Sequence, residues 1–288
     1  MSLIILFICG LLWSIFDLVR KLAIESYSLK YILYITIFSQ LIIFMISLLL
    51  SDTSISSYNY YPLLFIIAIL NILSLYLFLK ALEIEEISIC IPMLSYSPLF
   101  SLLFSKLILK EGLSTEQHIG ILVIFFGSFV LYSKSLLLKD LLFSPFLLIK
   151  NKGAQLIIIV NVIWSVIPVL DKKSLTYTDI YMHGFMQSLL GFILLSFLLF
   201  NNFSFNIPKI KTKKAIFILT LLIVIGFSAT ITQLFALKVN FVPILEVVKR
   251  ATGILFSLVF GYFFFKEEIG KKKLLSVMII ITGLSLAI

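Results

Sequence analysis

Three charged side chains inside one strongly apolar stretch are the residues of this chain best placed to do chemistry. The stretch Val242–Phe265 suits a membrane-spanning helix, yet it contains Glu246, Lys249 and Arg250. Each charge costs about 2.5–3.5 kcal/mol at the middle of a membrane, whereas each large apolar residue there gains only about 0.3–0.6 kcal/mol. We therefore expect the three charges to face protein, water or a ligand rather than lipid.

Their spacing predicts a cluster, because residues three and four apart share one face of a helix. A pair between Glu246 and Arg250 would leave Lys249 free, and the net positive charge would suit a carboxylate or phosphate on a substrate. The alternative is that both cations extend to the nearer membrane surface and Glu246 only pairs with them.

Two tryptophans and one aspartate are further candidates. Trp13 and Trp164 lie near the middle of apolar runs, where they could form the aromatic wall of a binding cavity or simply pack in the core. Asp17 lies one turn beyond Trp13, and a carboxylate at membrane depth can hold a proton or a cation. Asp17 and Glu246 are therefore candidates for binding a coupling ion. The alternative for Asp17 is an ion pair with Arg20 or Lys21.

The composition excludes a soluble globular protein. Of the 288 residues, 61% are hydrophobic and 13% are charged, whereas soluble domains contain about 45–50% apolar and about 25% charged residues. Long apolar runs indicate an integral membrane protein, of the type found in a bacterial inner or plasma membrane. The net charge of +9 lies mostly in short loops, which fits topology and contact with the lipid bilayer rather than nucleic acid.

No cofactor or metal site is expected from the sequence. Cys9 and Cys90 both lie in apolar runs, and His118 and His183 are far apart. His183 begins a span close to Asp179, so we expect an ordinary interfacial histidine there, and we assign no role to His118. These residues supply neither a metal cluster nor a nucleophile, which argues against a membrane-embedded enzyme.

Ten apolar runs predict an all-α fold with ten transmembrane helices. The runs are Leu3–Val19, Tyr31–Leu50, Pro62–Leu79, Ile87–Leu109, Gln117–Tyr132, Ala154–Leu170, Ile180–Phe200, Ala215–Leu237, Val242–Phe265 and Leu274–Ile288. Three prolines inside two of the runs predict kinks, which serve either as hinges or as fixed bends: Pro92, Pro98 and Pro168.

The two halves of the chain share short motifs. Leu12-Trp13-Ser14-Ile15 matches Ile163-Trp164-Ser165-Val166, and Lys110-Glu111-Gly112-Leu113 matches Lys266-Glu267-Glu268-Ile269. We therefore predict two five-helix repeats, residues 1–134 and 154–288, joined by an interfacial linker over residues 135–153. Because five is odd, the second repeat must be inverted in the membrane, and inverted repeats place a binding site at their interface near the midplane.

The five-plus-five plan, the Trp-Ser pairs, the proline-bearing segment Ile91–Pro98 and the Lys-Glu turns resemble the EamA family of the drug/metabolite transporter superfamily. The resemblance implies secondary transport of small metabolites, often export of amino acids or related solutes. It also implies a cavity lined mainly by the first, third, fourth, sixth, eighth and ninth spans. Four polar residues on those spans join the candidate binding residues: Asn71, Tyr96, Asn161 and Gln233.

The charged ninth span departs from the resembled family, in which that span carries mostly apolar or small residues. The equivalent part of the fourth span, around Cys90 and Met93, carries no charge. We therefore expect one half of the protein to supply the charge of the cavity.

The sequence favours a transporter that moves a small polar or anionic metabolite, amino-acid-like or an organic anion, by alternating access and in the direction of export. The alternatives are a flippase for a lipid-linked phosphate-bearing intermediate and a non-transporting membrane scaffold. Counting basic residues in the loops places both termini outside the cytoplasm, whereas the family resemblance places both inside. The sequence does not distinguish a monomer from a homodimer.

Overall fold

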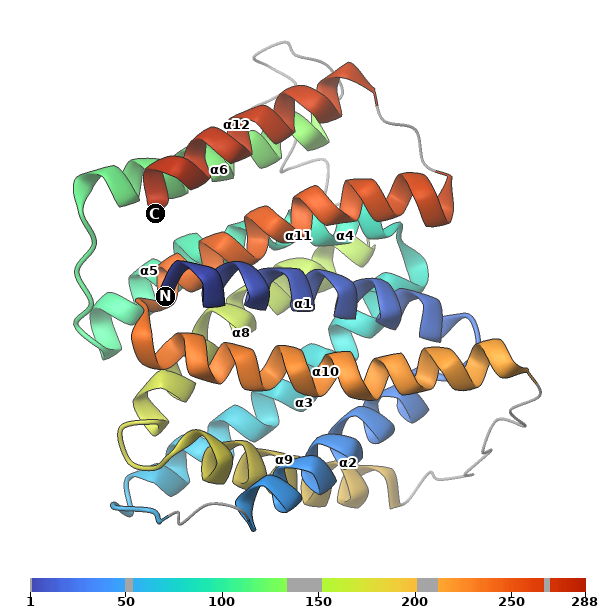
Figure 1. Ribbon diagram of the computed structural model, residues 1–288, viewed down its shortest axis with the longest axis vertical. Coiled ribbons are helices and arrows are strands. Elements are labelled where there is room, and N and C mark those ends of the chain that lie inside the picture. Colours follow the sequence, from blue (N-terminus) through green and yellow to red (C-terminus); the bar gives the residue numbers. More distant parts are fainter. Residues whose placement is uncertain (1, 50–53, 134–151, 201–211, 267–269) are drawn as a thin grey trace.

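The computed structural model describes residues 2–49, 54–133, 152–200, 212–266 and 270–288 (Figure 1). Every regular element in these ranges is helical, as predicted. The helices are α1 (Ser2–Ile24), α2 (Leu29–Leu48), α3 (Tyr60–Ile84), α4 (Ile87–Met93), the 3-10 turn η1 (Leu94–Tyr96), α5 (Ser97–Ile108), α6 (Thr115–Tyr132), α8 (Lys152–Ser174), α9 (Ile180–Phe200), α10 (Lys213–Val239), α11 (Val242–Phe265) and α12 (Lys271–Ala287).

Each of the ten predicted apolar runs coincides with helical structure. Six of the helices are long and apolar enough to cross a membrane on their own: α1, α2, α3, α8, α9 and α10. The predicted linker lies outside the described residues, except that Lys152 and Gly153 already belong to α8. Prolines lie within two of the helical segments: Pro98 in the fourth run and Pro168 in α8.

The fourth apolar run is divided rather than continuous. Helix α4 ends at Met93, η1 follows, and α5 starts at Ser97 with Pro98 in its first turn. Proline fits the first turn of a helix because it has no backbone N–H to leave unpaired there. The side-chain amide of Asn161 on α8 donates to the carbonyl oxygen of Met93 at 2.9 Å. This bond holds the divided helix against α8.

The helices of the two halves pack against each other in corresponding pairs. Contacts join α1 to α10 and α3 to α8, α1 to α11 and α8 to α5, and also α2 to α9 and α6 to α12. Figure 1 shows α6 and α12 together at the top, α2 and α9 together at the bottom, and the other helices between them. In the same view α1 runs from left to right and α8 runs from right to left.

Glycines bring α6 and α12 into close contact. A Cβ atom added to Gly120 would lie 2.7 Å from the carbonyl oxygen of Gly283, and one added to Gly283 would lie 2.8 Å from the backbone nitrogen of Ile124. Only glycine fits at that separation, and small residues are the usual means of bringing helix backbones together in a membrane.

Candidate functional site

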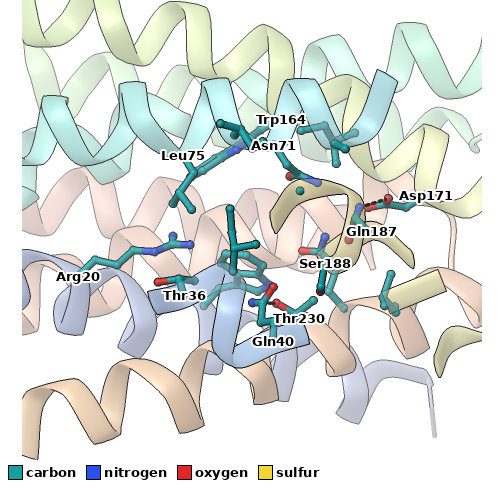
Figure 2. A pocket seen from close by; sticks show the side chains of 18 residues that line it. Arg20, Thr36, Gln40, Asn71, Leu75, Trp164, Asp171, Gln187, Ser188 and Thr230 are labelled. Carbon is teal, nitrogen blue, oxygen red and sulfur yellow. Dashed lines mark hydrogen bonds between the residues drawn. The ribbon is translucent and has the colours of Figure 1, made fainter. Parts of the chain in front are cut away.

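A cavity of about 110 Å³ lies between α1, α2 and α3 of the first half and α8, α9 and α10 of the second (Figure 2). Its walls mix apolar and polar groups contributed by all six helices. The lining residues are Trp13, Arg20, Thr36, Ile37, Gln40, Ala68, Asn71, Ile72, Leu75, Trp164, Ile167, Asp171, Gln187, Ser188, Gly191, Thr230, Gln233 and Leu234. The second and seventh predicted spans, α2 and α9, therefore line the cavity in place of the fourth and ninth spans that the resemblance implies.

The charged groups of the lining lie at opposite ends. Figure 2 shows Arg20 at one end of the cavity and Asp171, with Gln187, at the other. Arg20 comes from α1 and Asp171 from α8. The expectation that one half supplies all the charge of the cavity is therefore not met, because each half contributes one charged lining residue.

Arg20 is held by aromatic rings and by one carboxylate. Its Nη1 atom donates to Asp17 Oδ1 at 3.0 Å, and its guanidinium carbon lies 3.8 Å from the centre of the Phe16 ring. A guanidinium has five N–H groups, and Asp17 accepts from only one of them. Arg20 can therefore still donate to a ligand in the cavity. Asp17 is paired in this way, as in the alternative considered for it.

Asp171 is held by two side chains of α9. Its Oδ1 atom accepts from Gln187 Nε2 at 3.1 Å and lies 3.1 Å from His183 Nε2. His183 is completely buried, and its Nδ1 atom lies 3.0 Å from the hydroxyl oxygen of Tyr60 at the start of α3. The histidine is thus part of a hydrogen-bonded chain that ends at the cavity.

The two tryptophans form part of the cavity wall, one from each half. Trp164 donates from Nε1 to Ser74 Oγ at 3.0 Å and packs on Phe78. Trp13 packs on Phe16. Of the two interpretations considered for these residues, the aromatic wall agrees with their positions in the lining.

The three charged residues of α11 form a cluster, as predicted, but they do not line the cavity. Lys249 is not left free as expected, because it pairs with Glu246 as Arg250 does. Glu246 is completely buried and accepts from Lys249 at 2.8 Å and from Arg250 at 3.0 Å. Lys249 also donates to Gln233 Oε1 at 2.6 Å, and Arg250 donates from Nε to Ser97 Oγ at 2.8 Å. All three side chains point into protein rather than lipid, as the insertion energies require.

Each cation of α11 contacts one of the two tryptophans. Lys249 Nζ lies 4.9 Å from the ring centre of Trp13, and the guanidinium carbon of Arg250 lies 5.4 Å from that of Trp164. Cations over an indole face are stabilised by the ring quadrupole. The cluster therefore contacts the two tryptophans of the cavity wall without lining the cavity itself.

The remaining predicted binding residues divide into two groups. Asn71 and Gln233 line the cavity. Asn161 is buried and bonds the backbone of the divided helix, and Tyr96 packs edge-on against Phe125 of α6. The structure does not bring Asn161 and Tyr96 into the cavity lining.

Arg20 and Asp171 were not among the predicted binding residues, although their positions in the sequence indicate that they share a helix face with the tryptophans. Arg20 is seven residues after Trp13, and Asp171 is seven residues after Trp164. Seven residues are close to two helical turns, so each charge lies on the same helix face as its tryptophan. The match between the two Trp-Ser motifs therefore extends to Arg20 and Asp171 and could have indicated that they lie near the tryptophans.

The buried charges of the described residues balance one another. Within the described part of the chain, the buried Asp, Glu, Lys and Arg residues comprise three acids and three bases: Asp17, Asp171, Glu246, Arg20, Lys249 and Arg250. With His183 neutral, the interior carries no net charge. Adding a net charge to a buried, low-dielectric site is costly unless it is compensated, so this interior suits a ligand whose own charges cancel.

A helical membrane protein with a charged cavity between its halves is the class that these features define. The sequence profile of the EamA-like transporter family matches residues 1–133 and 151–288. The chain belongs to the EamA-like transporter family, whose members are membrane transporters rather than enzymes.

A solved structure supports the fold independently. A chain described only as "Crystal structure of protein" superposes on 99% of this chain and 97% of its own length, with a TM-score of 0.74 and 16% sequence identity. At this identity the likeness shows the fold alone. No curated protein sequence matches the chain.

Proposed function

We propose that this protein is a secondary transporter that exports a small zwitterionic metabolite of the amino-acid type by alternating access. The observation that carries the proposal is the placement of Arg20 and Asp171 at opposite ends of one cavity, with Trp13 and Trp164 in its wall. A carboxylate of the substrate binds Arg20, and an ammonium group binds Asp171. The site lies in a bacterial-type inner or plasma membrane.

The size of the cavity supports a small substrate. Sites for drug-sized ligands occupy about 300–1,000 Å³, whereas this cavity occupies about 110 Å³. The polar lining supports a substrate that hydrogen-bonds along its length, since Gln40 is already oriented by a bond of 2.9 Å to Thr230. The balanced interior charge favours a zwitterion over an organic anion, because an anion would bring one uncompensated charge into the protein.

The helix pairing supports alternating access. Two five-helix repeats related by an approximate two-fold axis would exchange α1 with α8, α3 with α10 and α5 with α11. The pairs α1–α10 and α3–α8 are then equivalent, as are α1–α11 and α8–α5. The pairs α1–α10 and α3–α8 line the cavity, which lies at the interface of the two halves, where inverted-repeat transporters bind substrate before one half moves against the other.

Transport by purified protein tests the proposal. Proteoliposomes loaded with an equimolar mixture of radiolabelled L-amino acids should lose at least one label faster than protein-free vesicles. Asp171→Asn should slow that efflux by about tenfold or more, because a hydrogen bond to a charged group contributes about 1.5–3 kcal/mol. Glu116→Gln, a carboxylate change on the exposed start of α6, is the matched control and should transport normally.

Two outcomes would overturn the proposal: no amino acid leaves the vesicles faster than background, or Asp171→Asn transports as fast as wild type. The same vesicles carrying a fluorescent phospholipid test the flippase alternative. Lipid scrambling without amino-acid efflux would favour that alternative instead.

A further inference from the structure

A buried chain of three side chains connects the cavity to the beginning of α3 and α9. Asp171 Oδ1 lies 3.1 Å from His183 Nε2, and His183 Nδ1 lies 3.0 Å from the Tyr60 hydroxyl. His183 and Tyr60 are completely buried, and Asp171 is 2% exposed and lines the cavity. Tyr60 is the first residue of α3 and follows the exposed Tyr58 and Asn59. These three hydrogen-bonded side chains therefore run from the start of α3 to the cavity.

The geometry accommodates His183 in either charge state. In the neutral ring, Nε2–H donates to Asp171 and Nδ1 accepts from the Tyr60 hydroxyl. In the protonated ring both nitrogens donate, and the Tyr60 oxygen becomes an acceptor after its hydroxyl hydrogen rotates. Neither state leaves a ring nitrogen without a partner. A buried histidine with a purely structural role needs only one of these states, whereas this site fits both with the same heavy-atom positions.

We infer that Asp171 and His183 form the proton-binding site of this transporter, with the proton carried on His183 next to the cavity. This inference rests on the proposed function, to which it adds the coupled ion. It differs from the expectation that Asp17 or Glu246 binds the ion, because both of those carboxylates are paired with permanent cations. Asp171 lies instead beside an imidazole, which can itself take up and release a proton.

The groups around His183 are compatible with this role. Tyr60 approaches it from α3 with Tyr61 next in the chain, Asp171 approaches from α8, and Asp179 caps the start of α9 through bonds to the backbone of Tyr181 and Met182. The other two helices that pack on this end of α9 present rings: Phe44 of α2 lies against Gly184, and Phe235 of α10 lies against Tyr181. The charged side chains named among these groups are the carboxylates of Asp171 and Asp179.

Proton and substrate would then compete through Asp171. With His183 neutral, the Asp171 carboxylate is free to attract an ammonium group in the cavity. With His183 protonated, the imidazolium neutralises the same carboxylate and weakens that attraction. By linkage, a bound ammonium must weaken proton binding at His183 to the same degree. Such competition exchanges protons for substrate.

Nitrogen NMR tests the proton site without any transport assay. The chain has two histidines, so protein labelled with ¹⁵N-histidine gives one signal set for His183 and one for the partly exposed His118. His183→Gln assigns them. We expect the His183 signals to change from those of the neutral ring to those of the protonated ring as the pH is lowered. Asp171→Asn should move this change to lower pH, because the imidazolium loses its carboxylate partner.

A His183 signal that stays in one state from pH 5 to pH 9 while His118 titrates would overturn the proton site. Tyr60→Phe is a milder second variant: it removes one hydrogen bond and keeps the ring, so that His183 still titrates. An unchanged titration in Asp171→Asn would contradict the pairing even if that variant folds normally.

Transport tests the coupling. Amino-acid efflux from the vesicles described above should accelerate at least severalfold when the outside is made acidic, and His183→Gln should transport at a rate that no longer depends on the pH gradient. Efflux in wild type that ignores the gradient would overturn the coupling. If His183 titrates but no amino acid moves, the proposed function fails and the proton site stands.

Discussion

Helices α1 and α8 carry the same motif, but the charged residue that each contributes to the cavity is held in a different way. Each has a Trp-Ser pair, and each has a charged residue seven positions after the tryptophan that reaches the cavity, Arg20 in α1 and Asp171 in α8. Four positions after the tryptophan they differ: α1 has Asp17, whereas α8 has Pro168. Arg20 therefore pairs with a carboxylate of its own helix, Asp17. Asp171 has its partners on a different helix, α9.

The difference gives the two ends of the cavity different behaviour. Arg20 and Asp17 form a permanent pair, since an arginine side chain does not lose its proton under ordinary conditions. The partners of Asp171 are an amide and an imidazole, and only the imidazole can change charge near neutral pH. One half of the protein thus offers a fixed charge and the other an adjustable one.

Disrupting the charged cluster of α11, which contacts both tryptophans, should have the largest effect on stability. Glu246→Gln leaves Lys249 and Arg250 buried without their carboxylate, so we expect the free energy of unfolding to fall by about 3–5 kcal/mol. Denaturant titration in detergent micelles measures this loss. Glu116→Gln on the surface should change it by less than about 0.5 kcal/mol.

The same experiment has a second arm that separates charge from packing. Replacing all three residues together, as Glu246→Leu with Lys249→Met and Arg250→Met, removes the charges and keeps most of the volume. This triple variant should be more stable than Glu246→Gln, because apolar replacement of a whole buried network is often neutral. A triple variant less stable than the single one would show that the cluster acts mainly through its contacts with the tryptophans.

The sequence predicted most of the helices because hydrophobic run length carries that information locally. Ile180–Phe200 and Val242–Phe265 were predicted at the bounds that the structure has. The prolines of the fourth run indicated its division. The sequence did not indicate that Asn161 of α8, far away in the chain, bonds Met93 at the point of the break.

The site was harder to predict, because lining depends on which helix face turns inward. Glu246, Lys249 and Arg250 are charged residues in an apolar helix, and their spacing predicts that they pair with one another. The spacing does not predict that they lie away from the cavity, because this depends on the tryptophans of two other helices, which lie between them and the cavity. Asp171 was hidden for a different reason: it precedes Lys172 and Lys173 at a helix end, where an ordinary charged exit from the membrane is expected.

The fixed-charge end of the cavity is tested by Arg20→Lys. Lysine keeps the positive charge but loses the planar fork that binds a carboxylate with two hydrogen bonds. We expect the substrate concentration for half-maximal transport to rise about tenfold, with the response to the pH gradient unchanged. Lys30→Arg, on the exposed first turn of α2, is the control. Loss of the pH response in Arg20→Lys would mean that the two ends are not independent.

Replacing each tryptophan with phenylalanine should have the smallest effect and should distinguish the two helices. Trp164 donates to Ser74 Oγ and contacts Arg250, so Trp164→Phe loses a hydrogen bond of about 1 kcal/mol together with part of a cation–π contact. In the described residues Trp13 Nε1 has no hydrogen-bond partner, so Trp13→Phe loses only part of the cation–π contacts with Lys249 and Arg20. We expect Trp164→Phe to lower stability by about 1 kcal/mol more than Trp13→Phe, and Ser74→Ala to remove most of that difference in a double-mutant cycle. Equal losses from the two tryptophans would show that the hydrogen bond of α8 contributes nothing, and that the asymmetry between the helices is confined to their charged ends.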